Sequence, residues 1–367
     1  MSDLEDNPAL LPRLCDQLAG QATAEACFLA AEASGRLPHA WLLTGPRGVG
    51  KATLAYRIAR FMLAGGSGRN QEPGLFGDAG NPASLEMAPD QPVFRRVAAG
   101  GHPDLRVLKR EFDLKRKKLK SEISVDDVRA CIEFFRRTSV EGGWRVIIVD
   151  SADEMNRSSA NALLKILEEP PARALLLLVS HSPGRLLPTI RSRCRQLSLV
   201  PLRQATVETL LTQQAPELSR EDAQALAGLA EGSIGRALAL SQSGGLDLYR
   251  DLAGLLAHLP QLDIRKVHEF GDRMNRDSSG VLFRTSCELL TWWIARLVRQ
   301  GAEGQRPAEI IDGEAAVMER LIARHGLAPW LALWENLTRL FARAEASALD
   351  RKQVMVSAFL DLENLAS

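Results

Sequence analysis

Cysteine is scarce in this sequence, and the few cysteines are scattered. The chain has 367 residues and five cysteines, at positions 15, 27, 131, 194 and 287, with no Cys-x-x-Cys pair among them. Disulfide frameworks and cysteine zinc sites need paired or closely spaced cysteines. The sequence therefore predicts neither, and a reducing cytoplasm is the simplest setting for the protein.

An excess of charge and a long apolar run are also missing. Lys and Arg number 46 and Asp and Glu 45, which leaves a formal net charge of +1. A chain with this balance is no polycationic coat for nucleic acid, so any contact with DNA must be local or made through partners. The longest purely apolar runs, residues 26–31 and 174–179, are far shorter than the ~18 residues of a membrane span, so no membrane segment is expected.

Apolar residues are plentiful, at 46% of the chain, which is enough for a buried core. A length of 367 residues corresponds to two or three domains. Three runs are apolar nearly throughout, as buried parallel strands are: residues 41–44, 144–149 and 175–179. Helical patterns lie among them, at residues 51–62, at residues 158–167, and after a capping box made by Ser124 and Asp127. This alternation predicts an α/β fold with a mostly parallel sheet.

Beyond about residue 200 amphipathic helical patterns take over. Residues 207–240 predict a small helical unit, and the patterns at 279–299, 329–344 and 351–365 predict an all-helical C-terminal region. We therefore expect three domains, with the bounds 1–200, 201–243 and 244–367. Residues 65–92 are rich in Gly, Pro, Asn and Asp and predict a long loop. Core packing or subunit contacts explain four tryptophans at helical spacings better than ligand stacking does: Trp292, Trp293, Trp330 and Trp334.

A glycine-rich segment follows the first predicted strand and begins the first predicted helix. Its sequence GPRGVGKAT has the Gly-x4-Gly-Lys spacing of a phosphate loop. Glycines let backbone N–H groups curl around phosphate, the lysine adds a cation, and the helix N-terminus adds a partial positive charge. An incidental glycine-rich turn is the alternative, and the strand–loop–helix context argues against it. The predicted nucleotide-binding residues are Gly45, Pro46, Gly48, Gly50, Lys51, Ala52, Thr53 and Asp150.

Two positions of this site differ from those of an enzyme that hydrolyses ATP with magnesium. Ala52 stands where a Ser or Thr hydroxyl would bind Mg²⁺, and Thr53 lies one residue later, about 100° further round the helix. The second predicted strand ends in Asp150, the carboxylate of a Walker B element, but Ser151 follows where an active ATPase of this type has a glutamate. No metal ligand is predicted.

Residues 161–194 carry the most specific resemblance. Their sequence, NALLKILEEPPARALLLLVSHSPGRLLPTIRSRC, contains an ALLKxLEEPP helix end and a Ser-Arg-Cys motif, and it closely resembles the clamp-loader branch of the AAA+ proteins. The upstream stretches LPHAWLLTGPRGVGKATLAYRIARFML and ISVDDVRACIEFFRRTSVEGGWRVIIVDSADEMN resemble the same family. The resemblance is close over residues 36–200 and weaker beyond. It implies an α/β P-loop (AAA+) domain, a small helical lid and an all-α C-terminal collar.

In such loaders a ring of subunits opens a sliding clamp and closes it on primed DNA, with ATP bound between neighbouring subunits. The resemblance implies that this chain is a subunit that supplies an arginine finger to a neighbour. Arg193, the arginine of the Ser-Arg-Cys motif, is the expected finger, and Arg191 and Arg195 flank it. A solvated basic loop is the alternative interpretation. The implied partners are the gamma or tau motor subunits, a delta subunit, the sliding clamp and primed DNA.

Two further positions resemble sensor elements of the family. Ser180 ends the third predicted strand, where a polar residue would read the terminal phosphate in a motor subunit. Gly235 occupies the arginine position of the second sensor motif, and Arg236 follows one residue later. Together with Ala52 and Ser151, these residues predict ATP binding without efficient hydrolysis. The alternatives are an autonomous AAA+ ATPase, either a motor subunit or a ring helicase, and a scaffold that binds no nucleotide.

Relatives often carry a four-cysteine zinc module after the helix that follows the phosphate loop. This chain has no cysteine between positions 27 and 131, so no zinc is predicted. Residues 106–120 carry eight Lys or Arg against Glu111 and Asp113. They could contact DNA phosphates or an acidic partner, but a solvated hairpin or loop is the preferred interpretation because only Phe112 interleaves the charges.

Overall fold

The computed structural model describes residues 11–67, 84–113, 118–304 and 309–367. The middle of the predicted loop at 65–92 and part of the basic segment at 106–120 lie outside these residues. The chain divides into two compact units. Unit 1 is Met1–Leu210 with Glu231–Gly235, and unit 2 is Leu211–Ala230 with Arg236–Ser367. The division into three domains stays a prediction.

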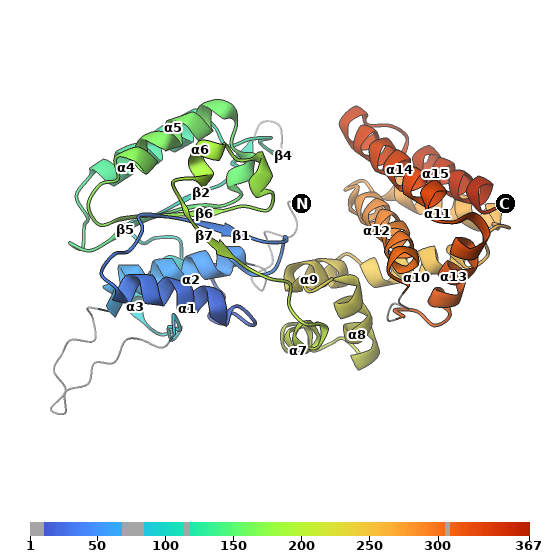
Figure 1. The fold of residues 1–367 in the computed structure, drawn as a ribbon, viewed down its shortest axis with the longest axis horizontal. Coiled ribbons are helices and arrows are strands. Elements are labelled where there is room, and N and C mark those ends of the chain that lie inside the picture. Colours follow the sequence, from blue (N-terminus) through green and yellow to red (C-terminus); the bar gives the residue numbers. More distant parts are fainter. Residues whose placement is uncertain (1–10, 68–83, 114–117, 305–308) are drawn as a thin grey trace. The chain divides into compact units, whose positions relative to one another are not determined.

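Unit 1 contains a parallel five-stranded sheet with the strand order β2-β5-β6-β1-β7 (Figure 1). Three strands confirm the predicted ones and are buried along their whole length, because their side chains are almost all apolar: β1 (Ala40–Thr44), β5 (Arg145–Val149) and β6 (Ala174–Val179). The edge strands β2 (Leu105–Leu108) and β7 (Arg195–Ser198) were not predicted. Both contain exposed polar side chains, which interrupt the apolar pattern.

Helices cover both faces of this sheet (Figure 1). One face packs against α1 (Ala22–Ala33), α2 (Lys51–Leu63) and α3 (Pro92–Ala98). The other face packs against α4 (Val125–Arg136), α5 (Arg157–Glu168) and α6 (Pro188–Arg191). Side chains alternate between the two cores along each central strand, so Trp41 and Leu43 face α2 while Leu42 faces the opposite core. The helix α4 begins with the predicted capping box of Ser124 and Asp127.

Shorter elements complete the first part of the chain. Within the basic segment, β3 (Phe112–Asp113) pairs with β4 (Lys118–Leu119) as an antiparallel hairpin. Short 3-10 turns follow β5 and β6, at Ala152–Glu154 and Pro183–Arg185. After β7 come α7 (Gln204–Gln214), α8 (Arg220–Leu229) and α9 (Ile234–Gln242), which confirm the helical pattern predicted at 207–240.

The rest of unit 2 is helical, as predicted. Its six longer helices are α10 (Gly245–Leu256), α11 (Ile264–Arg276), α12 (Val281–Glu303), α13 (Glu314–His325), α14 (Ala328–Ser347) and α15 (Arg351–Ala366). Trp293 and Trp330 are fully buried, and Trp292 meets the ring of Tyr249 edge-on at 5.9 Å. These contacts confirm core packing for the three tryptophans. Among the described residues, no helix is both long and apolar enough to cross a membrane.

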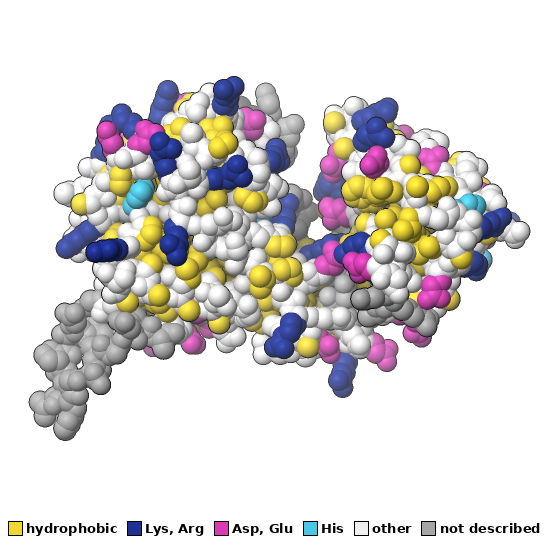
Figure 2. Space-filling model, viewed as in Figure 1, with side chains coloured by type: hydrophobic (Ala, Val, Ile, Leu, Met, Phe, Trp, Pro, Cys, Tyr) yellow, Lys and Arg dark blue, Asp and Glu magenta, His cyan; other side chains and the backbone are white. Residues whose placement is uncertain are grey.

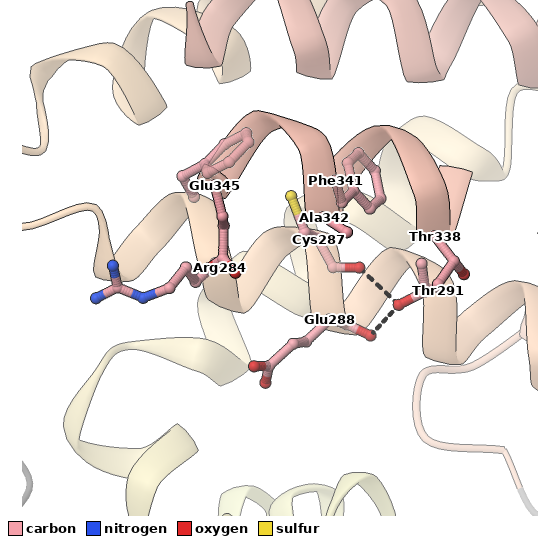
Figure 3. Close-up of a pocket in the computed structure, with 9 residues that line it drawn as sticks. Arg284, Cys287, Glu288, Thr291, Thr338, Phe341, Ala342 and Glu345 are labelled. Atoms are coloured by element: carbon pink, nitrogen blue, oxygen red, sulfur yellow. Dashed lines mark hydrogen bonds between the residues drawn. The ribbon is translucent and has the colours of Figure 1, made fainter. Parts of the chain in front are cut away.

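A cavity of about 230 Å³ lies between α12 and α14 (Figure 3). Cys287 and Phe341 line its apolar part, and Thr291 stands at one end. The Thr291 hydroxyl donates to the carbonyls of Cys287 at 2.8 Å and Glu288 at 3.1 Å, so its hydrogen bonds go to its own helix. The lining therefore offers mainly apolar surface.

Candidate functional site

The predicted site residues lie at opposite edges of the parallel sheet. Residues 45–51 follow β1 and Asp150 follows β5, so both lie where the strands end, which we call the carboxyl edge. Arg193 precedes β7, and β7 runs parallel to β1 with Arg195 beside Trp41. Arg193 therefore lies where the strands begin, which we call the amino edge. The five residues of β1 span about 16 Å at about 3.3 Å per residue. The structure thus separates Arg193 from the phosphate loop of its own chain.

The phosphate loop between β1 and α2 needs its glycines. Gly45 has φ 136° and Gly50 has φ 101°, conformations that residues with a Cβ rarely adopt. A Cβ on Gly45 would stand 2.4 Å from the carbonyl oxygen of Leu199, and one on Gly50 would stand 2.6 Å from a methyl group of Leu18. The curled backbone is therefore fixed by close packing on both sides.

Lys51 is the last residue of the phosphate loop and the first residue of α2, and its side chain folds back into the loop. Its side chain is buried, and its Nζ donates to the carbonyls of Gly45 at 2.6 Å and Pro46 at 2.5 Å. Burial lowers the pKa of Lys51 to about 8, although the nearby carboxylates of Asp153 and Asp150 act to raise it. The ammonium group thus satisfies the loop's own carbonyls.

At the end of β5, a hydroxyl stands where a catalytic carboxylate would be. Ser151 has a left-handed backbone, with φ 64°, and its Oγ lies 3.2 Å from His181 Nε2. The His181 amide donates to Asp153 Oδ1 at 2.9 Å, which ties the turn after β5 to the turn after β6. Burial, together with the charges of Lys51 and Arg47, lowers the pKa of His181 to about 4, so the imidazole is neutral at pH 7. The pair therefore has no carboxylate to activate water.

Gly235 lies directly against the phosphate loop. Its N–H donates to the carbonyl of Gly48 at 3.0 Å, and a Cβ at this position would stand 2.9 Å from the Cα of Gly48. A side chain cannot enter this space unless the loop moves. This close approach gives a physical reason for glycine at a position where the sensor motif has arginine.

At the amino edge, Arg193 extends from a short turn after α6. The turn is anchored by Ile190, which is completely buried, and by Cys194, which packs against the same core. The Arg193 side chain is 37% exposed; its Nη1 donates to the Thr189 carbonyl at 3.2 Å, and its Nη2 lies 3.1 Å from Glu168 Oε1. Lys and Arg side chains gather over the part of unit 1 formed by α4, α5 and α6 (Figure 2). Arg193 is thus accessible, and the neighbouring Arg191 and Arg195 are exposed as well.

Three contacts at these edges were not predicted: Ser151 with His181, Gly235 with Gly48, and Glu168 with Arg193. The motif LEEPP pointed to the family, but no spacing in it indicates a partner for Glu168. Among the described residues, no group of three or more His, Cys, Asp or Glu is arranged to hold a metal ion.

The strand order, the loop after β1 and the acid after β5 define a P-loop fold of the AAA+ class. The chain belongs to the DNA polymerase III delta-subunit family, whose model matches residues 20–203, half of the chain. Its relatives include both delta' and tau subunits of DNA polymerase III.

The similarity to individual relatives covers part of each chain. The DNA polymerase III subunit delta' of Pseudomonas aeruginosa is 38% identical over 196 residues, 53% of each chain. The delta' subunit of Escherichia coli is 33% identical over 231 residues, 63% of each chain. The tau subunit of Escherichia coli is 32% identical over 211 residues, which is 56% of this chain and 29% of tau. The chain thus spans between half and two thirds of the length of the two delta' relatives.

Proposed function

We propose that the protein is a clamp-loader subunit of the delta' type that supplies Arg193 to the ATP site of a neighbouring motor subunit. One observation carries the proposal: Arg193 is exposed at the amino edge, a strand's length from its own phosphate loop. There its guanidinium cannot serve a nucleotide bound at residues 45–51, but it is accessible to a nucleotide on another subunit. Arginine fingers neutralise charge on the transferring phosphoryl group and raise hydrolysis rates by about 10³–10⁵-fold.

We propose that the chain's own phosphate loop binds ATP without efficient hydrolysis. Lys51 would exchange the Gly45 and Pro46 carbonyls for phosphate oxygens, and the N-terminus of α2 would add its partial charge. Ala52 brings no hydroxyl for Mg²⁺, and Ser151 brings a hydroxyl paired with a neutral imidazole instead of a carboxylate. The residues thus suit binding of the nucleotide better than activation of water.

The family relationship supports the partners. Delta' and tau are both subunits of DNA polymerase III, and this chain is similar to both. We propose that it assembles with gamma or tau motor subunits and a delta subunit, and that it reaches the sliding clamp and primed DNA through that complex. The polymerase activity would reside in the larger assembly, and the helical C-terminal region would form the collar.

The proposal is tested by reconstituting the loader with Arg193→Ala. Hydrolysis at the motor site that Arg193 serves should fall by about 10³-fold or more, and clamp loading should fall with it. Arg191→Ala is the matched control, because Arg191 is also exposed and lies two residues away. Wild-type ATPase and clamp loading with Arg193→Ala would overturn the finger assignment.

An autonomous ATPase is the second candidate, favoured by the Gly-x4-Gly-Lys spacing of the loop and by Lys51. Sustained hydrolysis by the purified chain alone, abolished by Lys51→Ala, would establish it. A scaffold without nucleotide is distinguished by titration with fluorescent ATP, since the loop predicts saturable binding.

A further inference from the structure

Glu168, the partner of Arg193, is held in a fixed position. It is the last residue of α5, which ends there because Glu169 leaves the helical conformation and Pro170 follows. The two preceding residues, Ile166 and Leu167, are 3% exposed and anchor this end of the helix in the core. The carboxylate therefore projects from a rigid helix end at the amino edge.

The backbone that carries Arg193 is equally constrained. The Ser192 amide donates to the Pro188 carbonyl at 2.9 Å, and the Arg193 amide donates to the Ile190 carbonyl at 3.1 Å. With both backbones fixed, the arginine's position depends on its side-chain rotamer. The acceptors that direct this rotamer are the Thr189 carbonyl and Glu168.

We propose that Glu168 is a positioning residue for Arg193. Its carboxylate holds the guanidinium against the end of α5 until a phosphate of the nucleotide bound to a neighbouring subunit replaces it. This inference rests on the proposed function, because it assumes that Arg193 serves a nucleotide on another subunit. The side chains of the pair are 37% and 52% exposed, and exposed pairs of this kind are weak. Phosphate offers the guanidinium stronger, charge-assisted hydrogen bonds, so the exchange is favourable when a nucleotide approaches.

The size of the effect follows from the exposure of the pair. An exposed ion pair contributes at most about 1 kcal/mol, which corresponds to about a fivefold change in an equilibrium constant. Removing the carboxylate should therefore make Arg193 easier to recruit by no more than about fivefold. The change should appear in kcat/KM, which compares the transition state with the unengaged enzyme.

The test is the ATPase of a loader reconstituted with Glu168→Gln. We expect kcat/KM for ATP to rise by up to about fivefold over wild type. Glu169→Gln, which removes the same charge one residue away, is the matched control and should leave kcat/KM unchanged. In a chain that already carries Arg193→Ala, Glu168→Gln should have no effect. An unchanged or lower kcat/KM with Glu168→Gln, or the same rise in the Arg193→Ala background, would overturn the inference.

A second measurement needs only the purified chain. Phenylglyoxal modifies accessible arginines, and mass spectrometry of the peptide that contains Arg193 gives its rate of modification. Glu168→Gln should raise this rate, and Glu169→Gln should not; equal rates in both variants would contradict the pairing. If Arg193→Ala leaves the activity of the loader unchanged, the proposed function fails. If Arg193→Ala inactivates the loader but Glu168→Gln changes nothing, only the role of Glu168 is overturned.

Discussion

The two edges of the same sheet differ in what they leave accessible. At the carboxyl edge Lys51 is 3% exposed and donates to the carbonyls of its own loop, and Gly235 closes against Gly48. At the amino edge the Arg193 side chain is 37% exposed and held by a surface ion pair. The Gly-x4-Gly-Lys spacing therefore does not by itself indicate where the chain acts, because Lys51 is buried within its own loop whereas Arg193 is accessible at the opposite edge.

The two cations also suit different tasks. Burial lowers the pKa of Lys51 to about 8, so its charge depends on conditions and on what else fills the loop. A guanidinium stays charged at any physiological pH and offers a planar set of donors to phosphate. An arginine is therefore the better group to present to another subunit.

The amino edge can be disrupted most strongly through Ile190, which is completely buried under the turn that carries Arg193. Ile190→Ala should lower the free energy of unfolding by about 2–5 kcal/mol, because it removes buried methyl groups and leaves a cavity. Urea denaturation measures this change. Thr189→Ala, on the exposed side of the same turn, should change stability by less than about 0.5 kcal/mol. Wild-type stability for Ile190→Ala would mean that the turn is not anchored as described.

The carboxyl edge can be disrupted through Gly45. Gly45→Ala places a Cβ 2.4 Å from the Leu199 carbonyl oxygen at φ 136°, so it should cost about 1–3 kcal/mol of stability and reduce binding of fluorescent ATP. Gly143→Ala is the control, since nothing lies within 4 Å of a Cβ there. If Gly45→Ala binds ATP as tightly as the control, the loop is not the nucleotide site.

A smaller effect concerns pH at the carboxyl edge. Lys51 carries its charge below its pKa of about 8 and loses it above, so ATP affinity should be steady near pH 7 and fall as the pH rises towards 9. The fall should not exceed about tenfold per pH unit. Titrations of wild type and Lys51→Ala across this range check the prediction. The variant should bind weakly with little dependence on pH, and a flat profile for wild type would contradict the role of Lys51.

The sequence is informative where a pattern is local. The strands β1, β5 and β6 could be predicted because almost every side chain in them is apolar, and the phosphate loop because its spacing is contiguous. The edge strands could not be predicted in the same way. In β7 only Leu197 is buried, so Arg195 and its neighbours look like a charged loop in the sequence.

Contacts between residues that are far apart in the sequence could not be predicted from it. Ser151 and His181 lie 30 residues apart and meet only because β5 and β6 are neighbours in the sheet. Glu168 meets Arg193 because α5 and α6 pack side by side, and Gly235 meets Gly48 through a backbone hydrogen bond that no side-chain pattern encodes. The candidate residues of the site could thus be predicted one by one from the sequence. The contacts that each of them makes with a distant residue could be seen only in the folded structure.

The most direct test compares ATP hydrolysis by motor subunits alone, by this chain alone, and by the two together. From the proposed function we expect no sustained turnover by this chain alone, an increase when wild-type chain joins the motor subunits, and no increase when the chain carries Arg193→Ala. Turnover by the isolated chain, or an equal increase with Arg193→Ala, would contradict it.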